Sequence, residues 1–215
     1  MMSMSRMDEI LQVWRSEHRI PYPLSAQETW AFWVLESPTY DVKVRAVLEY
    51  GQRFSLDTLI ETGTFQGAMI QATKHYFQQV FSIELNYPLF WSASKKFAAD
   101  PNVKIIFGDS AEKLPALIST IQKPCLFWLD GHYIPLSAEA AKGSKDTPIL
   151  QELDSILEHP VRNHVILIDD ARCFIGPNPL LNDFPTIQEL EAYVLTKRPD
   201  MQYTVKNDII RIHLP

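Results

Sequence analysis

The chain has 215 residues and a formal net charge of −6, with 46% apolar and 21% charged residues. This composition is typical of a globular domain that buries a sizeable core, and it excludes a disordered chain. The negative charge and the absence of lysine and arginine clusters argue against a nucleic-acid partner held through phosphates. The sequence contains no apolar run as long as a membrane span and no signal-peptide core near its start, so we expect a cytoplasmic protein without a membrane partner.

The first quarter of the chain is predicted to be helical. Residues 8–18 and 26–50 carry apolar side chains at helical spacing, and Ser25 is placed to cap the second segment. The stretch RIPYPL between them is punctuated by prolines and is predicted to be a linker. We therefore divide the chain into a helical lid or docking segment, residues 1–52, and a main domain, residues 53–215.

Aromatic side chains are frequent in this N-terminal segment. We expect them to pack the segment onto the main domain, and a substrate platform is the alternative. Tryptophans left exposed in these helices would favour a homodimer. The side chains concerned are Trp14, Trp30, Phe32 and Trp33.

From residue 56 onward, short apolar runs alternate with amphipathic segments. The predicted strands are 56–61, 80–84, 103–107, 124–129 and 164–169. The predicted helices between and after them are 66–78, 87–99, 110–121, 147–158 and 186–197. Continuously apolar strands separated by helices indicate a parallel sheet that is covered on both faces.

The last residues predict a different kind of pairing. The stretch MQYTVKNDIIRIHL is expected to form two strands joined by a tight turn at Lys206, Asn207 and Asp208. The predicted fold class is therefore α/β, with a central, mostly parallel seven-stranded sheet, helices on both faces and a C-terminal antiparallel hairpin.

Each of the five parallel strands is followed at its carboxyl end by an acidic residue. Ligands of open parallel sheets bind outside these strand ends. Acids that only keep a surface hydrated would be expected mostly in loops and on helix faces, so this alignment indicates a binding site. The acids are Glu61, Glu84, Asp109, Asp130 and the pair Asp169 and Asp170.

The turn after the first strand, with Gly63 and Gly67, indicates a nucleotide-type cofactor. A dinucleotide-binding turn needs a middle glycine, and Phe65 stands in that region, where its bulk would crowd a pyrophosphate. Glu84 suits a carboxylate that accepts both ribose hydroxyls, and Asp109 is placed to meet an adenine amino group. Ribose and adenine contacts without a phosphate cradle indicate S-adenosylmethionine, although the two glycines could simply close the turn.

The predicted cofactor site can be stated residue by residue. It comprises Glu61, Thr62, Gly63, Phe65, Gly67, Glu84, Asp109, Ser110 and Asp130.

Over residues 56–215 the sequence resembles the class I S-adenosylmethionine-dependent methyltransferases, which have a Rossmann-like fold. The resemblance rests on LIETGTFQG, VFSIELN, IIFGDS and YTVKNDIIRIHL. FWLDGHY and VILIDDAR further resemble the metal-dependent O-methyltransferases of the macrocin type. That resemblance implies that Asp130, Asp169 and Asp170 hold a divalent metal. The first motif lacks its middle glycine, and residues 130–153 depart from the macrocin type, which implies a different substrate pocket.

These residues suit methyl transfer to oxygen, which is a direct displacement in a site that excludes water. A bound Mg²⁺ would lower the pKa of an acceptor hydroxyl. His132 is a candidate general base, with a supporting hydrogen bond or a substrate contact as alternatives, and Asp130 is the second predicted catalytic residue. The three aspartates could also serve only as helix caps and turn formers.

We therefore predict methylation of a small hydroxylated molecule, such as a sugar or a secondary metabolite. The alternatives are a metal-independent methyltransferase, one that acts on nitrogen, and a binding protein with a degenerate methyltransferase fold. A nicotinamide-dependent oxidoreductase comes last, because Phe65 and the absent third glycine argue against it.

Several other residues are expected to have structural roles or to form loops. Cys125 and Cys173 are expected to be buried, reduced thiols, and Trp128 a core residue. Residues 142–148 are expected to form a mobile loop beside the site, and residues 171–185 a structured loop over the pocket. Residues 131–148 and 171–185 are expected to shape the acceptor pocket. The histidines expected to be surface or structural residues are His18, His75, His159, His164 and His213.

Overall fold

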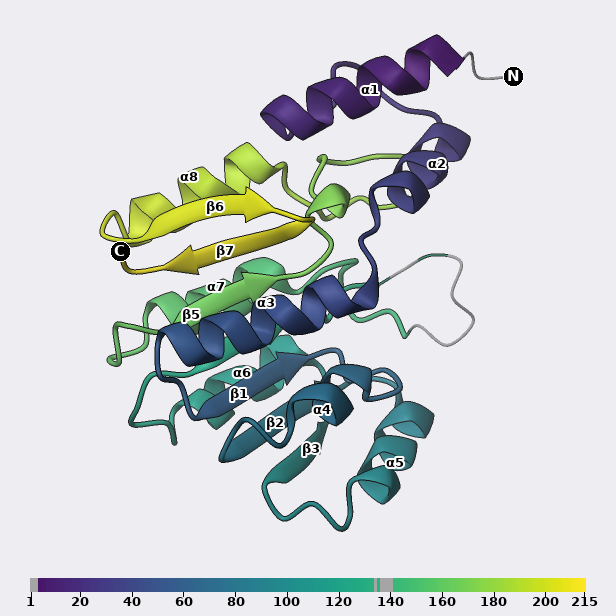
Figure 1. Ribbon diagram of the computed structural model, residues 1–215. Helices are drawn as coiled ribbons and strands as arrows, with labels where there is room; N and C mark the ends of the chain where they lie inside the picture. The colour runs from purple at the N-terminus through teal and green to yellow at the C-terminus, as the bar shows by residue number, and fades with distance from the viewer. Residues whose placement is uncertain (1–3, 134, 136–140) are drawn as a thin grey trace.

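The computed structural model describes residues 4–133, 135 and 141–215. Its centre is a seven-stranded sheet in the order β3-β2-β1-β4-β5-β7-β6 (Figure 1). The strands are β1 (Thr58–Thr62), β2 (Gln79–Glu84), β3 (Val103–Phe107), β4 (Leu126–Leu129), β5 (Val165–Ile168), β6 (Gln202–Lys206) and β7 (Ile209–His213). The pairs among β1 to β5 are parallel, whereas β7 runs antiparallel to both β5 and β6. The predicted fold class is confirmed.

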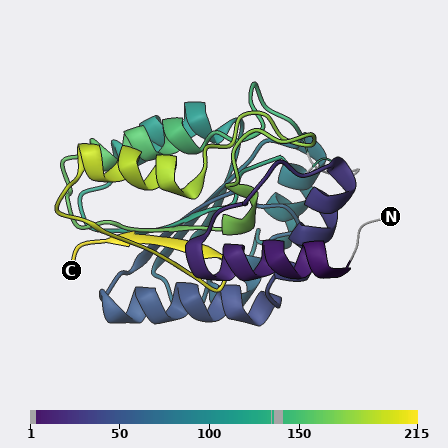
Figure 2. The same ribbon diagram turned by 90° about the horizontal axis from the view of Figure 1, so that it is seen from above.

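Helices cover both faces of this sheet, as Figure 2 shows from above. They are α1 (Met4–Glu17), α2 (Ala26–Glu36), α3 (Tyr40–Arg53), α4 (Ala68–Thr73), α5 (Tyr87–Lys96), α6 (Ser110–Ile118), α7 (Ile149–Leu157) and α8 (Ile187–Lys197). One core lies between the sheet and α3, α4 and α5. The other lies between the sheet and α6, α7 and α8, and α1 and α2 pack into it.

The central strands are buried on both faces, as expected of a covered parallel sheet. In β1, Leu59 belongs to the core of the α3 side and Ile60 to the opposite core. In β4, Trp128 is 1% exposed and packs on the α3 side, which confirms its predicted core position. The strands therefore form a rigid platform whose carboxyl ends can hold side chains in fixed positions.

The predicted helix over residues 26–50 is wrong in one respect, because it is two helices. Pro38 separates α2 from α3: it has no N–H to donate and disfavours helical geometry in the residue before it. Ser37 accordingly takes an extended conformation, with φ −69° and ψ 120°. The second helix, α3, packs on the sheet through the buried Ala46 and Val47. The division of the chain at residue 52 stays a prediction.

The aromatic residues of the N-terminal helices mostly pack inside. Trp14, Phe32 and Trp33 are buried, and the rings of Trp14 and Phe32 meet edge to face at 5.2 Å. Trp30 is 41% exposed. The packing role predicted for these side chains fits three of the four, and the homodimer stays a prediction.

Helix α4 ends at Thr73, five residues before the predicted end. The side-chain amide of Asn102 donates to the carbonyl oxygens of Lys74 and Phe77, at 2.8 and 3.0 Å. These carbonyls therefore bond to a side chain from the segment before β3 instead of continuing the helix. The closing hairpin has its turn at Asn207 and Asp208, both with positive φ, as a tight turn between antiparallel strands requires.

Candidate active site

A cavity of about 340 Å³ lies at the carboxyl ends of the parallel strands. The sheet order reverses there, because β2 lies on one side of β1 and β4 on the other. Six of the predicted cofactor residues line it: Gly63, Phe65, Glu84, Asp109, Ser110 and Asp130. Glu61, Thr62 and Gly67 are not among the described residues that form its wall.

Gly63 lets the ends of β1 and β4 approach closely. Its φ is +84°, and a Cβ atom at this position would lie 2.3 Å from the carbonyl oxygen of Asp130. Gly67 also has a positive φ, but it precedes α4 and its added Cβ would meet the ring of Phe97 at 2.6 Å. Gly63 therefore shapes the cavity, whereas Gly67 serves the packing of α4.

Glu84 holds the loop that follows β1. Its carboxylate accepts hydrogen bonds from the backbone N–H of Phe65, at 2.8 Å, and from that of Asn86, at 2.7 Å. Phe65 has φ +47° and its side chain is 47% exposed. Burial raises the pKa of Glu84 and the backbone hydrogen bonds oppose the rise. The carboxylate thus stands at the cavity wall and fixes the glycine turn beside it.

Asp109 and Ser110 stand where α6 begins. The carboxylate of Asp109 caps the helix by accepting from the N–H of Ala111 at 2.9 Å. Ser110 is buried at the first helical position. Both line the same cavity as Glu84, on the side of β3.

Glu61 and Thr62 lie behind the cavity, in the interior of the protein. Glu61 is 2% exposed and accepts a short hydrogen bond from the hydroxyl of Ser82. Burial raises its pKa to about 8, and the Ser82 hydrogen bond opposes this only in part. Thr62 is fully buried. These two residues lie in the interior, directly before the glycine turn in the sequence.

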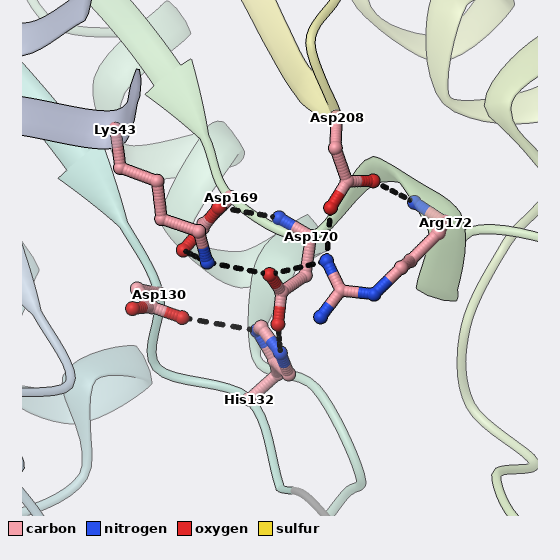
Figure 3. A network of polar contacts seen from close by, with 7 residues as sticks. All are labelled: Lys43, Asp130, His132, Asp169, Asp170, Arg172 and Asp208. Carbon is pink, nitrogen blue, oxygen red and sulfur yellow. Dashed lines mark hydrogen bonds and ion pairs between the residues drawn. The ribbon is translucent and has the colours of Figure 1, made fainter. Parts of the chain in front are cut away.

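An acidic cluster lies where Asp130 and Asp170 line the cavity, and this part of the wall is its acidic end (Figure 3). Oxygen atoms of Asp130, Asp169 and Asp170 lie within 4.8 Å of one another. The ammonium group of Lys43, which reaches over from α3, lies 2.5 Å from Asp169 Oδ2 and 2.8 Å from Asp170 Oδ1. The predicted metal ligands are therefore brought together, and a lysine stands among them.

Two further residues bind this cluster to the C-terminal hairpin. The guanidinium group of Arg172 donates to Asp170 Oδ1 at 2.8 Å and also to the carboxylate of Asp208. The backbone N–H of Arg172 donates to the same Asp208 side chain at 2.7 Å. Asp170 takes a left-handed conformation, with φ 54° and ψ 49°, between β5 and the short turn Ala171–Cys173. The hairpin turn thus anchors the end of β5.

His132 lies between two carboxylates. Its Nε2 atom is 3.1 Å from Asp170 Oδ2, and its Nδ1 atom is 3.7 Å from Asp130 Oδ1. The imidazole is only 4% exposed and meets the ring of Phe184 edge to face at 5.7 Å. The geometry fixes the ring plane and leaves it at the cavity wall.

The electrostatics of the cluster are uneven. Burial, followed by the charges of Asp169 and Asp170, raises the pKa of Asp130 well above its usual range. Burial likewise raises the pKa of Asp169 to about 7. Burial also acts on Asp170, but hydrogen bonding to His132 and the charge of Arg172 hold its pKa well below the usual range. The cluster therefore favours an additional positive charge or a proton.

The segment that precedes α7 lines the cavity. Among residues 142–148, Gly143, Ser144, Lys145 and Pro148 line it. The buried carboxylate of Asp146 accepts from the N–H of Asn182 at 2.7 Å, which connects this segment to residues 171–185. Residues 134 and 136–140 of the predicted acceptor loop lie outside the described residues.

The sequence interpretation missed Lys43, Arg172 and Asp208. Lys43 is separated from its partners by more than a hundred residues, so nothing local marks it. Arg172 lies two residues after Asp170, and Asp208 lies in the predicted hairpin turn. Both positions could have been read from the sequence as close to the predicted site.

Both cysteines and the pair His159 and His164 are buried. Cys125 and Cys173 are buried free thiols, as predicted. His159 Nδ1 lies 3.0 Å from His164 Nε2, and both side chains are buried, which the sequence spacing did not predict. Among the described helices, none is long and apolar enough to cross a membrane.

No family model matches the sequence, and no curated protein matches it either. Solved structures do. The SAH-bound methyltransferase PaMTH1 of Podospora anserina is 17% identical, with a TM-score of 0.56, over 100% of this chain and 98% of that chain. An O-methyltransferase of Bacillus cereus in complex with SAH is 13% identical, with a TM-score of 0.53, over 100% and 93%. The 23S rRNA methyltransferase ErmE is 16% identical, with a TM-score of 0.51, over 83% and 69%.

Proposed function

Given that the chain has the class I methyltransferase fold, we propose that it is an S-adenosylmethionine-dependent methyltransferase that acts on an oxygen of a small hydroxylated molecule, such as a sugar or a secondary metabolite. One observation carries the proposal: Gly63 and Glu84 line the same cavity as Asp130, Asp170 and His132. Its volume of about 340 Å³ is within the range of small-molecule sites.

The cofactor would lie along the strand ends. The cofactor would pass Gly63, which lines the cavity where the ends of β1 and β4 approach each other closely. Glu84 would accept the ribose hydroxyls through lone pairs that its two backbone partners leave available. Asp109 and Ser110 would meet the adenine. The sulfonium carries a positive charge, which the acidic end of the cavity would favour.

The acceptor would enter at that acidic end. Asp170 holds the imidazole of His132 through Nε2. Nδ1, which lies on the side of Asp130, would take the proton of an acceptor hydroxyl bound there. Asp130, the second proposed catalytic residue, would lie beside the same acceptor hydroxyl. The burial of His132 removes water from the proposed reaction site. A purely supporting hydrogen bond or a substrate contact stays the alternative role for His132.

Carboxylate oxygens are ligands that a hard divalent cation prefers, and Asp130, Asp169 and Asp170 would hold one if the ammonium group of Lys43 moved away. When bound, Mg²⁺ would polarise the acceptor oxygen and lower its pKa. In the structure, two of these three carboxylates are ion-paired with Lys43. In the metal-independent form of the reaction the ammonium group would stay between Asp169 and Asp170. In the metal-assisted form it would have to lie elsewhere.

A small acceptor is favoured over RNA by the net charge of −6, because phosphate binding needs basic side chains. A binding protein without catalysis, a nitrogen acceptor and a nicotinamide-dependent oxidoreductase stay alternatives. A cytoplasmic location and a homodimer stay predictions.

Calorimetric titration with S-adenosylhomocysteine (SAH), the product of the proposed reaction, tests the proposal. We expect wild type to bind SAH and Glu84→Ala to lose binding. Glu189→Ala is the matched control, because Glu189 also accepts a backbone N–H, at 2.8 Å, but caps α8 away from the cavity. A folded wild type that binds no SAH would refute the methyltransferase function and leave the binding-protein alternative.

A further inference from the structure

Lys43 occupies the place in the acidic cluster where a coordinated cation would bind. It lies in the first turns of α3, and its side chain is 14% exposed. Its ammonium group contacts Asp169 Oδ2 at 2.5 Å and Asp170 Oδ1 at 2.8 Å, and the residue also lines the cavity. Figure 3 shows the side chain pointing directly at this pair of carboxylates.

The carboxylate oxygens of Asp169 and Asp170 already accept hydrogen bonds from the protein. Asp169 Oδ1 accepts from the N–H of Asp170 at 2.8 Å, and Oδ2 accepts from Lys43. Asp170 Oδ1 accepts from Lys43 and from Arg172, and Oδ2 bonds to His132. A divalent ion coordinated by both carboxylates would lie against the ammonium group of Lys43, and the two positive charges would repel each other.

The charges agree with this reading. Four carboxylates, those of Asp130, Asp169, Asp170 and Asp208, gather in this part of the described structure, and Arg172 pairs with only two of them. Without Lys43, the buried Asp169 would keep no cationic partner among the described side chains. An uncompensated buried carboxylate is costly, so Asp169 favours a cation beside it or a bound proton.

We propose that Lys43 is the resident cation of the acidic cluster and stands in the place of a divalent metal, so that the native site works without one. The inference rests on the proposed methyltransferase function. An ammonium group carries three N–H donors, and two of them go to Asp169 and Asp170. The third bonds no group in the part of the chain that the structure describes, and it is left for an acceptor oxygen in the cavity.

The test measures binding of Mn²⁺ as a probe, by the loss of the electron paramagnetic resonance signal of the free ion. Wild type should leave the signal unchanged at concentrations where Lys43→Ala binds one ion. Because removal of the lysine leaves buried carboxylates unpaired, we expect Lys43→Ala to bind Mn²⁺ at least about tenfold more tightly. The double variant Lys43→Ala with Asp169→Asn should lose this binding.

Three further variants separate charge from structure. Lys43→Arg keeps the positive charge and should behave like wild type. Lys43→Met keeps the apolar stem, guards against a failure of the alanine variant to fold, and should bind Mn²⁺. Lys74→Ala is the matched control, because Lys74 is 11% exposed and paired with Asp100 at 2.7 Å outside the cavity; it should not bind the ion.

Equal Mn²⁺ affinities of wild type and Lys43→Ala, whether both bind or neither does, would overturn the inference. SAH titration of the same samples keeps the two hypotheses apart. Loss of SAH binding in every sample speaks against the methyltransferase function, whereas the Mn²⁺ result reports only on Lys43.

Discussion

A methyl group added at Gly63 would meet main-chain atoms. The residue has φ +84°, and an ideal Cβ would lie 2.3 Å from the carbonyl oxygen of Asp130 and 2.7 Å from its carbonyl carbon. Both atoms belong to the segment that leaves β4, the strand paired with β1. No side-chain rotation can relieve this overlap, so the two strand ends would have to separate.

The cost can be worked from two contributions. An L-residue in a left-handed conformation costs about 1–2 kcal/mol. Forcing extra atoms into packed structure typically costs about 1–3 kcal/mol more. We therefore expect Gly63→Ala to lower the free energy of unfolding by about 2–5 kcal/mol, out of a total of about 5–15 kcal/mol for an ordinary domain.

Gly176→Ala is the matched control. Gly176 also has a positive φ, +82°, but its added Cβ would meet only the methyl group of Thr186, at 3.2 Å. Urea unfolding followed by circular dichroism should show a loss of only about 1–2 kcal/mol there. SAH titration should show weaker binding for Gly63→Ala alone. Equal losses of stability in the two variants, or wild-type SAH affinity in Gly63→Ala, would refute the reasoning.

Three other predictions concern buried groups. Burial raises the pKa of Glu61 to about 8, compared with about 4.3 in the unfolded chain. Between these two pH values the folded state binds more protons than the unfolded state. The free energy of unfolding therefore falls as the pH rises, by about 1.4 kcal/mol per pH unit. Glu61→Gln should remove this share of the slope in urea titrations at several pH values, and an unchanged slope would contradict the assignment. Arg172→Met leaves Asp170 and Asp208 without the guanidinium and should cost about 3–5 kcal/mol by urea unfolding; a loss below about 1 kcal/mol, as for exposed pairs, would argue against it. Phe32→Ala empties a fully buried position and should cost about 3–5 kcal/mol by the same assay, and a near-neutral result would mean that α2 is not packed as described.

The sequence was sufficient for the sheet because the signal there is local. Apolar runs indicate the five parallel strands, and the tight turn at residues 206–208 indicates the final hairpin. Acids at strand ends share an edge in any parallel sheet, so Asp130, Asp169 and Asp170 could be placed together before their distances were known. The break at Pro38 was also readable, since proline seldom continues a helix.

Other features depend on contacts between distant parts of the chain. Which face α3 turns to the sheet decides whether Lys43 reaches Asp169, and helical periodicity does not give the direction of one charged side chain. Glu61 and Glu84 are both acids that end strands, yet one is enclosed behind Ser82 and the other stands at the cavity wall. This difference between the environments of Glu61 and Glu84 depends only on how the loop after β1 packs.

The place of β7 in the sheet also bears on how the protein is made. This strand lies between β5 and β6 although it comes last among the strands, so β5 lacks its antiparallel neighbour until all the other strands have been synthesised. Domains emerging from the ribosome fold from the N-terminal side, and long-range pairings form slowly. The turn before β7 supplies Asp208, the partner of Arg172. A nascent chain would therefore complete its sheet and its acidic cavity in the same late step.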